Sequence, residues 1–331
     1  MTISVIIKSL NEEQNIAACI ASVLADGTGM VSEIIVADSG SKDHTIAIAK
    51  QFPVTIVQLQ PPAKAGCGVG AQLGYQYSHS EFVCLLDGDM ELAPDFLRTA
   101  LSYLKSHPPL AGVTGHIREK DLRSLEYQRR AIRQRIENPV GLIDRMNGGG
   151  LYRRASIQST GYLSDRNLHA YEELDLGLRL SQKKWQLRRL DIPFVSHKGH
   201  SQNAYLLLKR RWRSGYLQGS GEILRAASSG NYLRQLIRAL PELKLWALVY
   251  GWWLVFFAAL LGAFVNFHWL WLAALVALAP VLLMAMKQRS FSMGLYSVVA
   301  WMFHAAALPF GFLKKRISPQ SFIESKILQK L

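Results

Sequence analysis

The sequence predicts an α/β fold, with a mostly parallel sheet flanked by helices, followed by a C-terminal helical transmembrane region. In the first third of the 331 residues, short β-branched runs alternate with stretches of helical periodicity, which is the pattern of βαβ units. The strand-like runs are continuously apolar, as expected for strands that a parallel sheet buries on both faces. Residues 245–283 are almost free of charge and rich in Trp, Leu, Ala and Phe, which is typical of membrane segments.

The elements of the first third are expected to follow one another at short intervals. The expected strands of this part cover residues 3–7, 33–37, 54–59 and 82–86. The expected helices around them cover residues 12–24, 43–51 and 70–77. The chain then predicts a helix from Ala93, a strand at 110–114, a solvated amphipathic helix at 118–137 and a strand at 187–195.

Polar side chains follow three of the expected strands at the point where each strand ends. Asn11 follows the first strand, Asp38 the second, and Asp87 and Asp89 the fourth. In an open sheet the carboxyl ends of parallel strands meet at one rim, where ligands bind. We therefore expect these side chains to line a common edge.

The triplet Asp87-Gly88-Asp89 points to a divalent cation. Mg²⁺ and Mn²⁺ take oxygen ligands, keep several waters and commonly bridge one or two carboxylates to the phosphates of a bound substrate. A metal-bound nucleotide is the corresponding ligand. Taken alone, the triplet also fits a tight turn, which Asp and Gly favour. An EF-hand loop is excluded because Leu92 stands where that loop requires glycine.

Three further motifs are assigned to local structure. The turn after Asp38 places Ser41 to cap the next helix and Asp43 in its first turn. Residues 66–71 imitate a dinucleotide-binding glycine motif, but they do not leave the first strand directly, which favours a flexible loop that a ligand approaches closely. The glycine run 148–150 is interpreted as part of a buried strand whose backbone packs against a bulky group.

Acidic residues open the expected helix that starts near Tyr171. The helix dipole favours Glu172 and Glu173 at this position. Adjacent acids also raise one another's pKa, which suits a general base that acts near neutral pH. His197 and His200 follow the last expected strand, and either imidazole could complete a metal shell.

The net charge and the cysteine content indicate which partners and which cellular compartment to expect. The net charge of +14 is compatible with nucleic acid, but many basic residues lie between 209 and 244, next to the apolar region. Positive charge beside a membrane segment suits an anionic cytoplasmic leaflet, so we expect membrane contact and no nucleic acid. The three cysteines show neither zinc spacing nor a disulfide framework, which indicates a reducing compartment and a cytosolic soluble part.

Two apolar stretches, 245–264 and 268–286, are each long enough to cross a hydrocarbon core of ~30 Å as helices. The short link between them predicts a hairpin, which returns Lys287 and Arg289 to the cytosol. A third apolar stretch, 291–313, precedes a basic tail. A full crossing would place that tail outside, so we favour an interfacial or re-entrant helix over a third span.

Taken together, the order of these motifs resembles family 2 glycosyltransferases of the membrane-anchored bacterial type. The resemblance covers residues 3–219 and rests on Asn11-Glu12-Glu13, Asp38, Asp87-Gly88-Asp89 and Glu172-Glu173-Leu174-Asp175. It implies a GT-A fold, a nucleotide-diphosphate sugar donor, a divalent cation (Mg²⁺ or Mn²⁺) and inversion at the anomeric carbon.

The resemblance also implies roles for individual residues. The donor-side positions are Asn11, Glu12, Asp38 and Asp87. The metal-side positions are Asp89, Asp87 and His197, with Asp89 as the direct ligand. The catalytic base is Glu173, where the family usually has an aspartate, or its neighbour Glu172.

Two departures from the family pattern bear on specificity. Lys8-Ser9-Leu10 stands where the family commonly has a proline and an aromatic residue, which changes the fit around the nucleobase. Arg211 and Trp212 resemble the end of the Gln-any-any-Arg-Trp motif of processive polysaccharide synthases, but Leu208 occupies its glutamine position. We therefore expect transfer of one sugar per acceptor, with Arg211 and Trp212 contacting diphosphate and acceptor.

These observations predict a metal-dependent transferase that acts on a lipid or lipid-linked acceptor at the cytosolic face of the plasma (inner) membrane, which its chain crosses more than once. The alternatives are a processive polysaccharide synthase, a catalytically inactive GT-A membrane scaffold, and a membrane oxidoreductase that uses the glycine loop. The expected domains are 1–220 for catalysis, 221–244 as a basic linker helix, 245–313 in the membrane and 314–331 as a basic tail.

Overall fold

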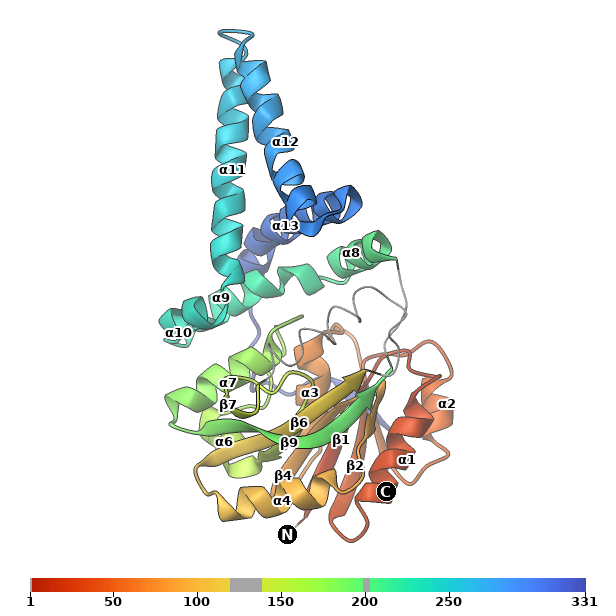
Figure 1. Cartoon of the computed structure of the whole chain (residues 1–331). Coiled ribbons are helices and arrows are strands. Elements are labelled where there is room, and N and C mark those ends of the chain that lie inside the picture. Colours follow the sequence, from red (N-terminus) through yellow and green to blue (C-terminus); the bar gives the residue numbers. More distant parts are fainter. Residues whose placement is uncertain (1, 120–138, 199–202) are drawn as a thin grey trace. The chain divides into compact units, whose positions relative to one another are not determined.

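The computed structural model describes residues 2–119, 139–198 and 203–331 (Figure 1). The chain divides into two compact units. The sheet unit contains Met1–Gln202 and Arg316–Leu331, and the helical unit contains Asn203–Lys315. The division thus falls at residue 202 and not at the expected 220, because the helix that follows packs inside the helical unit, where the rings of Trp212 and Phe303 meet edge-on at 5.4 Å.

A ten-stranded sheet forms the centre of the sheet unit, in the order β10-β3-β2-β1-β4-β8-β6-β9-β5, with β7 beside β9. The early strands β1 to β4 pair in parallel and cover Ile3–Ser9, Val31–Asp38, Thr55–Leu59 and Phe82–Asp87. The later strands β5 to β10 cover Met90–Leu92, Leu110–Glu119, Gly141–Ile143, Gly150–Arg153, Gln186–His197 and Ser325–Gln329. The α/β fold is confirmed, but the sheet is mixed, since β8 and β10 run antiparallel to their neighbours β4 and β3.

Helices cover both faces of this sheet, as Figure 1 shows. They are α1 (Ile16–Asp26), α2 (Thr45–Ala49), α3 (Cys67–Gln76), α4 (Phe96–Ser106), α6 (Arg154–Thr160) and α7 (Glu172–Gln182). Alternate side chains of β1 enter different cores. Ile3, Val5 and Ile7 pack with α1 and α4, whereas Ile6 packs with α3 and α7. This explains the continuously apolar strands in the sequence.

The glycine motif at 66–71 is not a flexible loop, because α3 begins at Cys67. Its glycines permit close packing of this helix. A Cβ on Gly68 would lie 2.1 Å from the carbonyl oxygen of Asp165, and one on Gly74 would lie 2.2 Å from Cγ2 of Ile6. Backbone packing therefore accounts for glycine at these positions.

Two local predictions were wrong. Ser41 does not cap α2; the helix starts at Thr45, and Asp43 Oδ1 accepts from the Thr45 N–H at 3.0 Å just before it. The strand predicted to end at 114 continues to Glu119, so the first residues of the expected helix at 118–137 belong to β6. The remainder of that expected helix lies outside the described residues.

The helical unit begins with α8 (Ala204–Arg213), the short helix η1 (Tyr216–Gln218), α9 (Gly219–Ser229) and α10 (Leu233–Ala239). The single linker helix expected at 221–244 is thus interrupted. Three longer helices follow, α11 (Glu242–Gly262), α12 (Trp269–Gln288) and α13 (Phe291–Leu313). Each is long and apolar enough to cross a membrane.

The C-terminal residues are not simply a basic tail. They return to the sheet unit, where β10 pairs with β3, matching Ile327 with Val57. Ile323, just before β10, is fully buried in the core on the α3 side. Arg316 reaches the buried Asp165 at 2.8 Å. Strand pairing, the buried Ile323 and the ion pair of Arg316 thus join this segment to the sheet unit.

Ile323→Ala is expected to destabilise the protein by about 2–4 kcal/mol, because it removes a buried side chain and leaves a cavity. Ile327→Ala is the matched control. Its side chain is 43% exposed, so the loss should stay below about 1 kcal/mol. Chemical unfolding of both purified variants measures the difference. Equal losses would contradict the burial of Ile323.

Candidate active site

Asp38 ends β2 fully buried and organises the loop that follows it. Its Oδ2 accepts from the N–H groups of Gly40 and Ser41, both at 2.9 Å, and from Nε2 of Gln58 at 3.0 Å. Its Oδ1 accepts from the hydroxyls of Ser41 at 2.5 Å and Ser9 at 3.3 Å. Both carboxylate oxygens of Asp38 are therefore engaged in holding the loop.

Asn11 and Glu12 connect that loop to the end of β1. The Asn11 N–H donates to Oγ of Ser41, and its Oδ1 accepts from the Lys42 N–H, both at 2.8 Å. Asn11 has a positive φ of 57°, a conformation that asparagine tolerates better than most residues. The side chain of Glu12 lies over Gly88, where an added Cβ would come within 3.0 Å of Glu12 Cγ. The loops after β1, β2 and β4 are thus joined.

A lysine lies among the acids at this rim. Lys8 and Asp87 are register partners on β1 and β4, and Lys8 Nζ lies 2.7 Å from Asp87 Oδ1. The same ammonium lies 3.7 Å from Oε1 of Glu172, at the start of α7. Burial alone would lower the pKa of Lys8, but Asp87 and Glu172 raise it well above its ordinary value. Lys8 is therefore a fixed positive charge.

Glu173 is held by the glycine run that precedes β8. Its Oε1 accepts from the Gly149 N–H at 2.6 Å, and its Oε2 from the Gly148 N–H at 2.8 Å. These glycines have φ values of +106° and +94°, which a side chain rarely allows. Burial and the charge of Glu172 raise the pKa of Glu173, and the charge of Lys8 and the Gly148 N–H reduce this shift only in part.

Asp89 and His197 form a second group on the same side of the molecule. His197 ends β9, and its Nε2 lies 3.1 Å from Asp89 Oδ2. Its Nδ1 lies 2.6 Å from Oε2 of Glu119, the last residue of β6. Burial lowers the pKa of His197, but its hydrogen bonds with the two carboxylates outweigh burial and raise that pKa to about 9.

The donor atoms of this group fit a divalent cation. Asp89 Oδ1 is buried and accepts no hydrogen bond from the residues that the structure describes, so it is an oxygen that needs a positive partner. No group of three or more His, Cys, Asp or Glu residues in the described part of the chain is placed to hold a metal ion. Asp89 therefore suits a cation whose remaining ligands are water and substrate phosphate. His197 and Asp87 are already paired, His197 through both ring nitrogens with Asp89 and Glu119 and Asp87 with Lys8, so His197 positions Asp89 instead of binding the cation itself.

Sequence reasoning missed two members of the site. The sequence relates Lys8 only to the fit around the nucleobase, whereas its place beside Asp87 follows from the pairing of β1 with β4. The charge pattern predicts a solvated helix at Glu119, which instead ends β6. Its partner His197 is 78 residues away, and no local pattern reveals that contact. His200 lies outside the described residues.

Arg211 and Trp212 belong to the helical unit and are described within it. The Arg211 guanidinium lies 5.3 Å from the centre of the Tyr216 ring, in a cation–π contact. Trp212 contacts Phe303 and Phe310 of α13.

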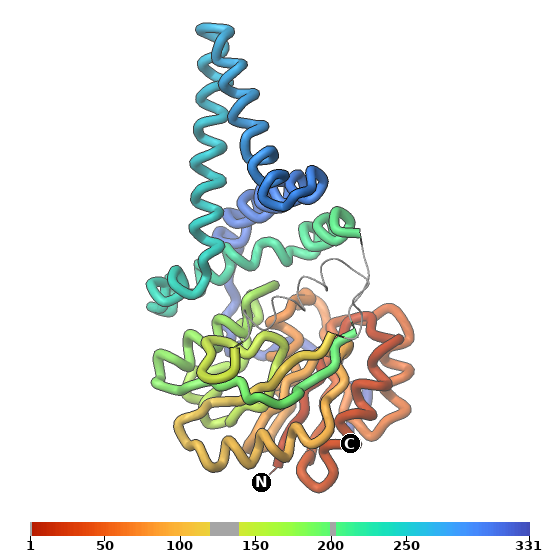
Figure 2. Tube along the Cα trace, in the orientation of Figure 1, coloured from red at the N-terminus to blue at the C-terminus, as the bar shows by residue number. Residues whose placement is uncertain are grey.

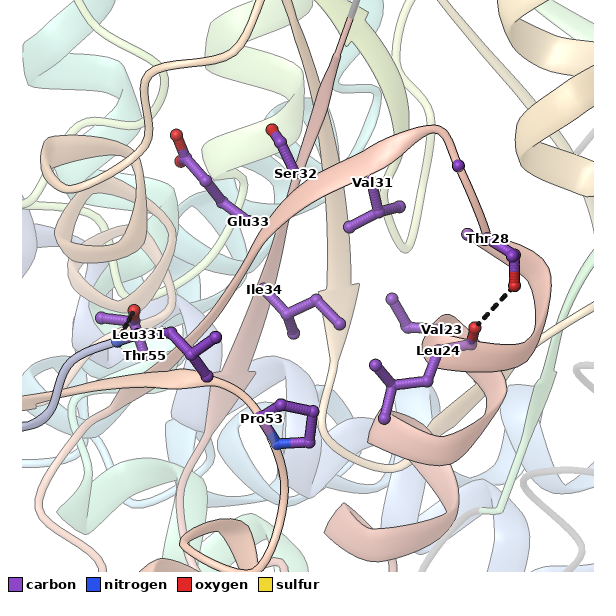
Figure 3. Close-up of a pocket in the computed structure, with 12 residues that line it drawn as sticks. Val23, Leu24, Thr28, Val31, Ser32, Glu33, Ile34, Pro53, Thr55 and Leu331 are labelled. Carbon is purple, nitrogen blue, oxygen red and sulfur yellow. Dashed lines mark hydrogen bonds between the residues drawn. The ribbon is translucent and has the colours of Figure 1, made fainter.

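A cavity of about 330 Å³ lies elsewhere in the sheet unit (Figure 3). It is lined by the end of α1 and by the first residues of β2 and β3, including Val31 and Thr55. Asp38 lies at the opposite, carboxyl end of β2, and Asp87 lies at the carboxyl end of β4. This cavity is therefore separate from the acidic rim.

Comparison with known proteins identifies the sheet unit. Residues 4–161 match the sequence model of the family described as "Glycosyl transferase family 2". Glucomannan 4-beta-mannosyltransferase 2 of Arabidopsis thaliana is 28% identical over 41% of this chain and 27% of its own length. The uncharacterized glycosyltransferase YibD of Escherichia coli is 29% identical over 30% of this chain and 29% of its own length. The chain thus spans less than a third of these curated relatives.

A solved structure shares the fold. The 1–349 fragment of S. aureus TarS, in complex with UDP-GlcNAc, superposes with a TM-score of 0.50 at 17% identity. The superposition covers 68% of this chain and 67% of the TarS chain.

Proposed function

Because residues 4–161 of this chain belong to glycosyl transferase family 2 and the sheet unit has the GT-A fold, we propose that the protein is an inverting glycosyltransferase. It moves a sugar from a nucleotide-diphosphate sugar to a lipid or lipid-linked acceptor. The observation that carries this proposal is the cluster at the carboxyl end of the sheet, where Lys8 joins Asp87 to Glu172 and the backbone of residues 148–149 fixes Glu173.

Glu173 is assigned as the general base. Two backbone N–H groups fix its carboxylate, and its raised pKa brings its proton affinity closer to neutral pH. It takes the proton of the acceptor hydroxyl while that oxygen attacks the anomeric carbon from the face opposite the leaving diphosphate. Glu172 is the charge partner of Lys8 and not the base.

The donor is assigned to the rim between Asp38 and Asp89. The loop that Asp38 holds, together with Asn11 and Glu12, shapes the nucleotide subsite. A divalent cation held by Asp89, which His197 positions, would offset the charge of the leaving diphosphate. Lys8 keeps a permanent positive charge among the neighbouring carboxylates, which reduces their repulsion toward a diphosphate.

The acceptor is assigned to the membrane surface. The apolar helices α11 and α12 attach the protein to the plasma (inner) membrane, with the sheet unit in the cytosol, and the donor site then shares a surface with a lipid acceptor. Arg211 and Trp212, on the basic helix α8, are assigned to diphosphate and acceptor. One sugar is transferred per acceptor.

The direct test is a donor screen. Membranes that contain the protein are incubated with radiolabelled nucleotide-diphosphate sugars and either Mg²⁺ or Mn²⁺, and the product is partitioned between organic solvent and water. We expect label in the organic phase for one donor. Absence of both transfer and donor hydrolysis with every donor and both cations would overturn the proposed function.

Lys8→Met is expected to move the acidic limb of the pH–rate profile to higher pH. The Lys8 charge lowers the pKa of Glu173, so its removal raises that pKa further and leaves less of the ionised base at a given pH. A shift of one pH unit lowers the rate on this limb about tenfold. The measurement is kcat/KM across the pH range.

Lys8→Arg is the matched control, because it keeps the charge. Its profile should stay close to that of the wild type. An unchanged pH profile in Lys8→Met would rule out electrostatic coupling between Lys8 and the base.

A further inference from the structure

The chain leaves the sheet unit after residue 202 and returns to it at Arg316. The return is secured by hydrogen bonds. β10 pairs with β3, and Gln76 on α3 exchanges hydrogen bonds with the backbone N–H and C=O of Ile323, at 2.8 and 3.2 Å. A bilayer cannot separate strands of one hydrogen-bonded sheet, because their backbone groups must stay paired. Both ends of the helical unit therefore lie on the same side of the membrane.

This connectivity limits the number of crossings to an even number. The helices α8, α9 and α10 have 10, 11 and 7 residues, too few to span ~30 Å of hydrocarbon. Only α11, α12 and α13 are long and apolar enough among the described residues. All three cannot cross, so a chain that crosses the membrane uses two of these helices and leaves the third on one side of it.

The helices α11 and α12 suit a crossing pair. They have 21 and 20 residues, about 30 Å each at 1.5 Å per residue. Figures 1 and 2 show them as a hairpin that is closest at the loop between the helices and spreads toward the other end. Trp252 Nε1 donates to the Val276 carbonyl at 2.8 Å near the middle of the pair, and Gly262 packs against the Trp269 ring at its tip.

The helix α13 instead follows the basic helix α8. The Tyr205 and Tyr296 rings meet at 5.2 Å, and Trp212 meets Phe303 at 5.4 Å and Phe310 at 6.4 Å. Contacts with α8 thus extend over about 21 Å of α13. Exposed charges on α8, at Lys209, Arg210 and Arg213, exclude that helix from the hydrocarbon centre. Because α13 packs along α8, it must lie at the same depth in the membrane as α8.

The end of α13 packs against another polar helix. A Cβ on Gly311 would lie 2.0 Å from the Gln218 carbonyl, and one on Gly221 of α9 would lie 2.0 Å from the Leu308 carbonyl. Lys314 then pairs with the fully buried Glu222 at 3.1 Å. Close backbone packing against η1 and α9 therefore holds one end of α13 to these helices. Its contacts with α11 and α12 include Gly294 beside Ala285, near the end of α12, and the Tyr250 hydroxyl that donates to the Ala305 carbonyl at 2.6 Å, in the first half of α11.

We propose that only α11 and α12 cross the membrane, and that α13 lies flat in a single leaflet, on the side of the sheet unit. Its exposed residues Phe291, Leu295, Met302 and Leu313 share one helical face. That face enters the acyl chains, while the basic residues of α8 meet anionic headgroups. The proposal rests on the membrane attachment in the proposed function.

Site-directed labelling tests the topology. Single cysteines replace Asn266 in the α11–α12 link, Arg289 in the α12–α13 link, and Lys315 after α13, all exposed positions. Lys183→Cys, exposed on the sheet unit, is the reference, and the parent chain controls for the native cysteines. A membrane-impermeant maleimide is applied to vesicles of each orientation.

We expect Arg289→Cys and Lys315→Cys to react from the same side as Lys183→Cys, and Asn266→Cys from the other side. Labelling of Arg289→Cys from the side of Asn266→Cys, with Lys315→Cys on the reference side, would make α13 a crossing helix and overturn the proposal. Labelling of all four from one side would overturn the membrane crossing itself, which is a different failure.

A depth measurement tests α13 directly. Spin labels at Leu295→Cys, Met302→Cys and Leu313→Cys are compared in nanodiscs by their accessibility to oxygen and to a water-soluble paramagnet. A flat helix gives three similar depths. A crossing helix separates the first and last labels by about 27 Å along its axis and would overturn the proposal.

Discussion

Glu173→Gln is expected to lower kcat by about 10²–10⁴-fold, the usual contribution of a positioned general base. The glutamine carbonyl can replace Oε1 and accept from the backbone of Gly148 and Gly149, so the site keeps its shape while it loses the base. Initial rates with saturating donor and acceptor measure the effect.

The pH dependence gives a second signature. Because the pKa of Glu173 is raised in the folded protein, wild-type kcat/KM should rise with pH, with a midpoint above the ordinary carboxylate range. Glu173→Gln should lose this limb. A raised folded pKa also means that the stabilisation present at acidic pH is lost as pH rises through that pKa. The variant should therefore be no less stable than the wild type at neutral pH, which thermal unfolding checks.

Two matched variants decide between the adjacent acids. Glu172→Gln should cost much less in kcat, because Glu172 serves as a partner of Lys8. Glu173→Asp restores the family's usual base and should recover part of the rate. A larger loss of kcat in Glu172→Gln than in Glu173→Gln would make Glu172 the general base and Glu173 the supporting residue. Full activity in Glu173→Gln would mean that no base is needed, as with a lipid phosphate acceptor that arrives ionised.

Asp89→Asn is expected to weaken Mn²⁺ binding and metal-dependent turnover by about 100-fold or more. Substitution of a residue that only hydrogen-bonds to a metal ligand already costs about 10–100-fold in metal affinity or activity, and Asp89 is assigned as a ligand itself. Asp89 contributes the buried oxygen that accepts no hydrogen bond from the described residues. An amide retains the shape of the carboxylate but not its charge. Mn²⁺ titration followed by electron paramagnetic resonance measures binding independently of turnover.

Asp191→Asn is the control for this change. Asp191 lies on the same strand as His197, but its side chain is 84% exposed and pairs only with His116 among the ion pairs of the described residues. It should bind Mn²⁺ like the wild type. Unchanged Mn²⁺ binding in Asp89→Asn would show that Asp89 is not a metal ligand.

Several features of the fold and of the site follow from local sequence. Continuous apolar runs predict β1 to β4, and the position of Asp38 and Asp87 at the ends of two of them predicts the rim where they lie. Acids before an apolar helical repeat predict the start of α7. These predictions succeed because the information lies within one element and its flanking turn.

The partners of these residues come from distant parts of the chain. The sequence alone placed the carboxylates at strand ends and the long apolar helices near the C-terminus, because both depend on short-range hydrophobic patterning. Only the tertiary structure joined Lys8 to Glu172, His197 to Glu119, and β10 to β3, because side-chain pairing and strand register depend on which elements pack together. The last of these contacts also restricts how the chain can cross a membrane, since a paired sheet must lie on one side.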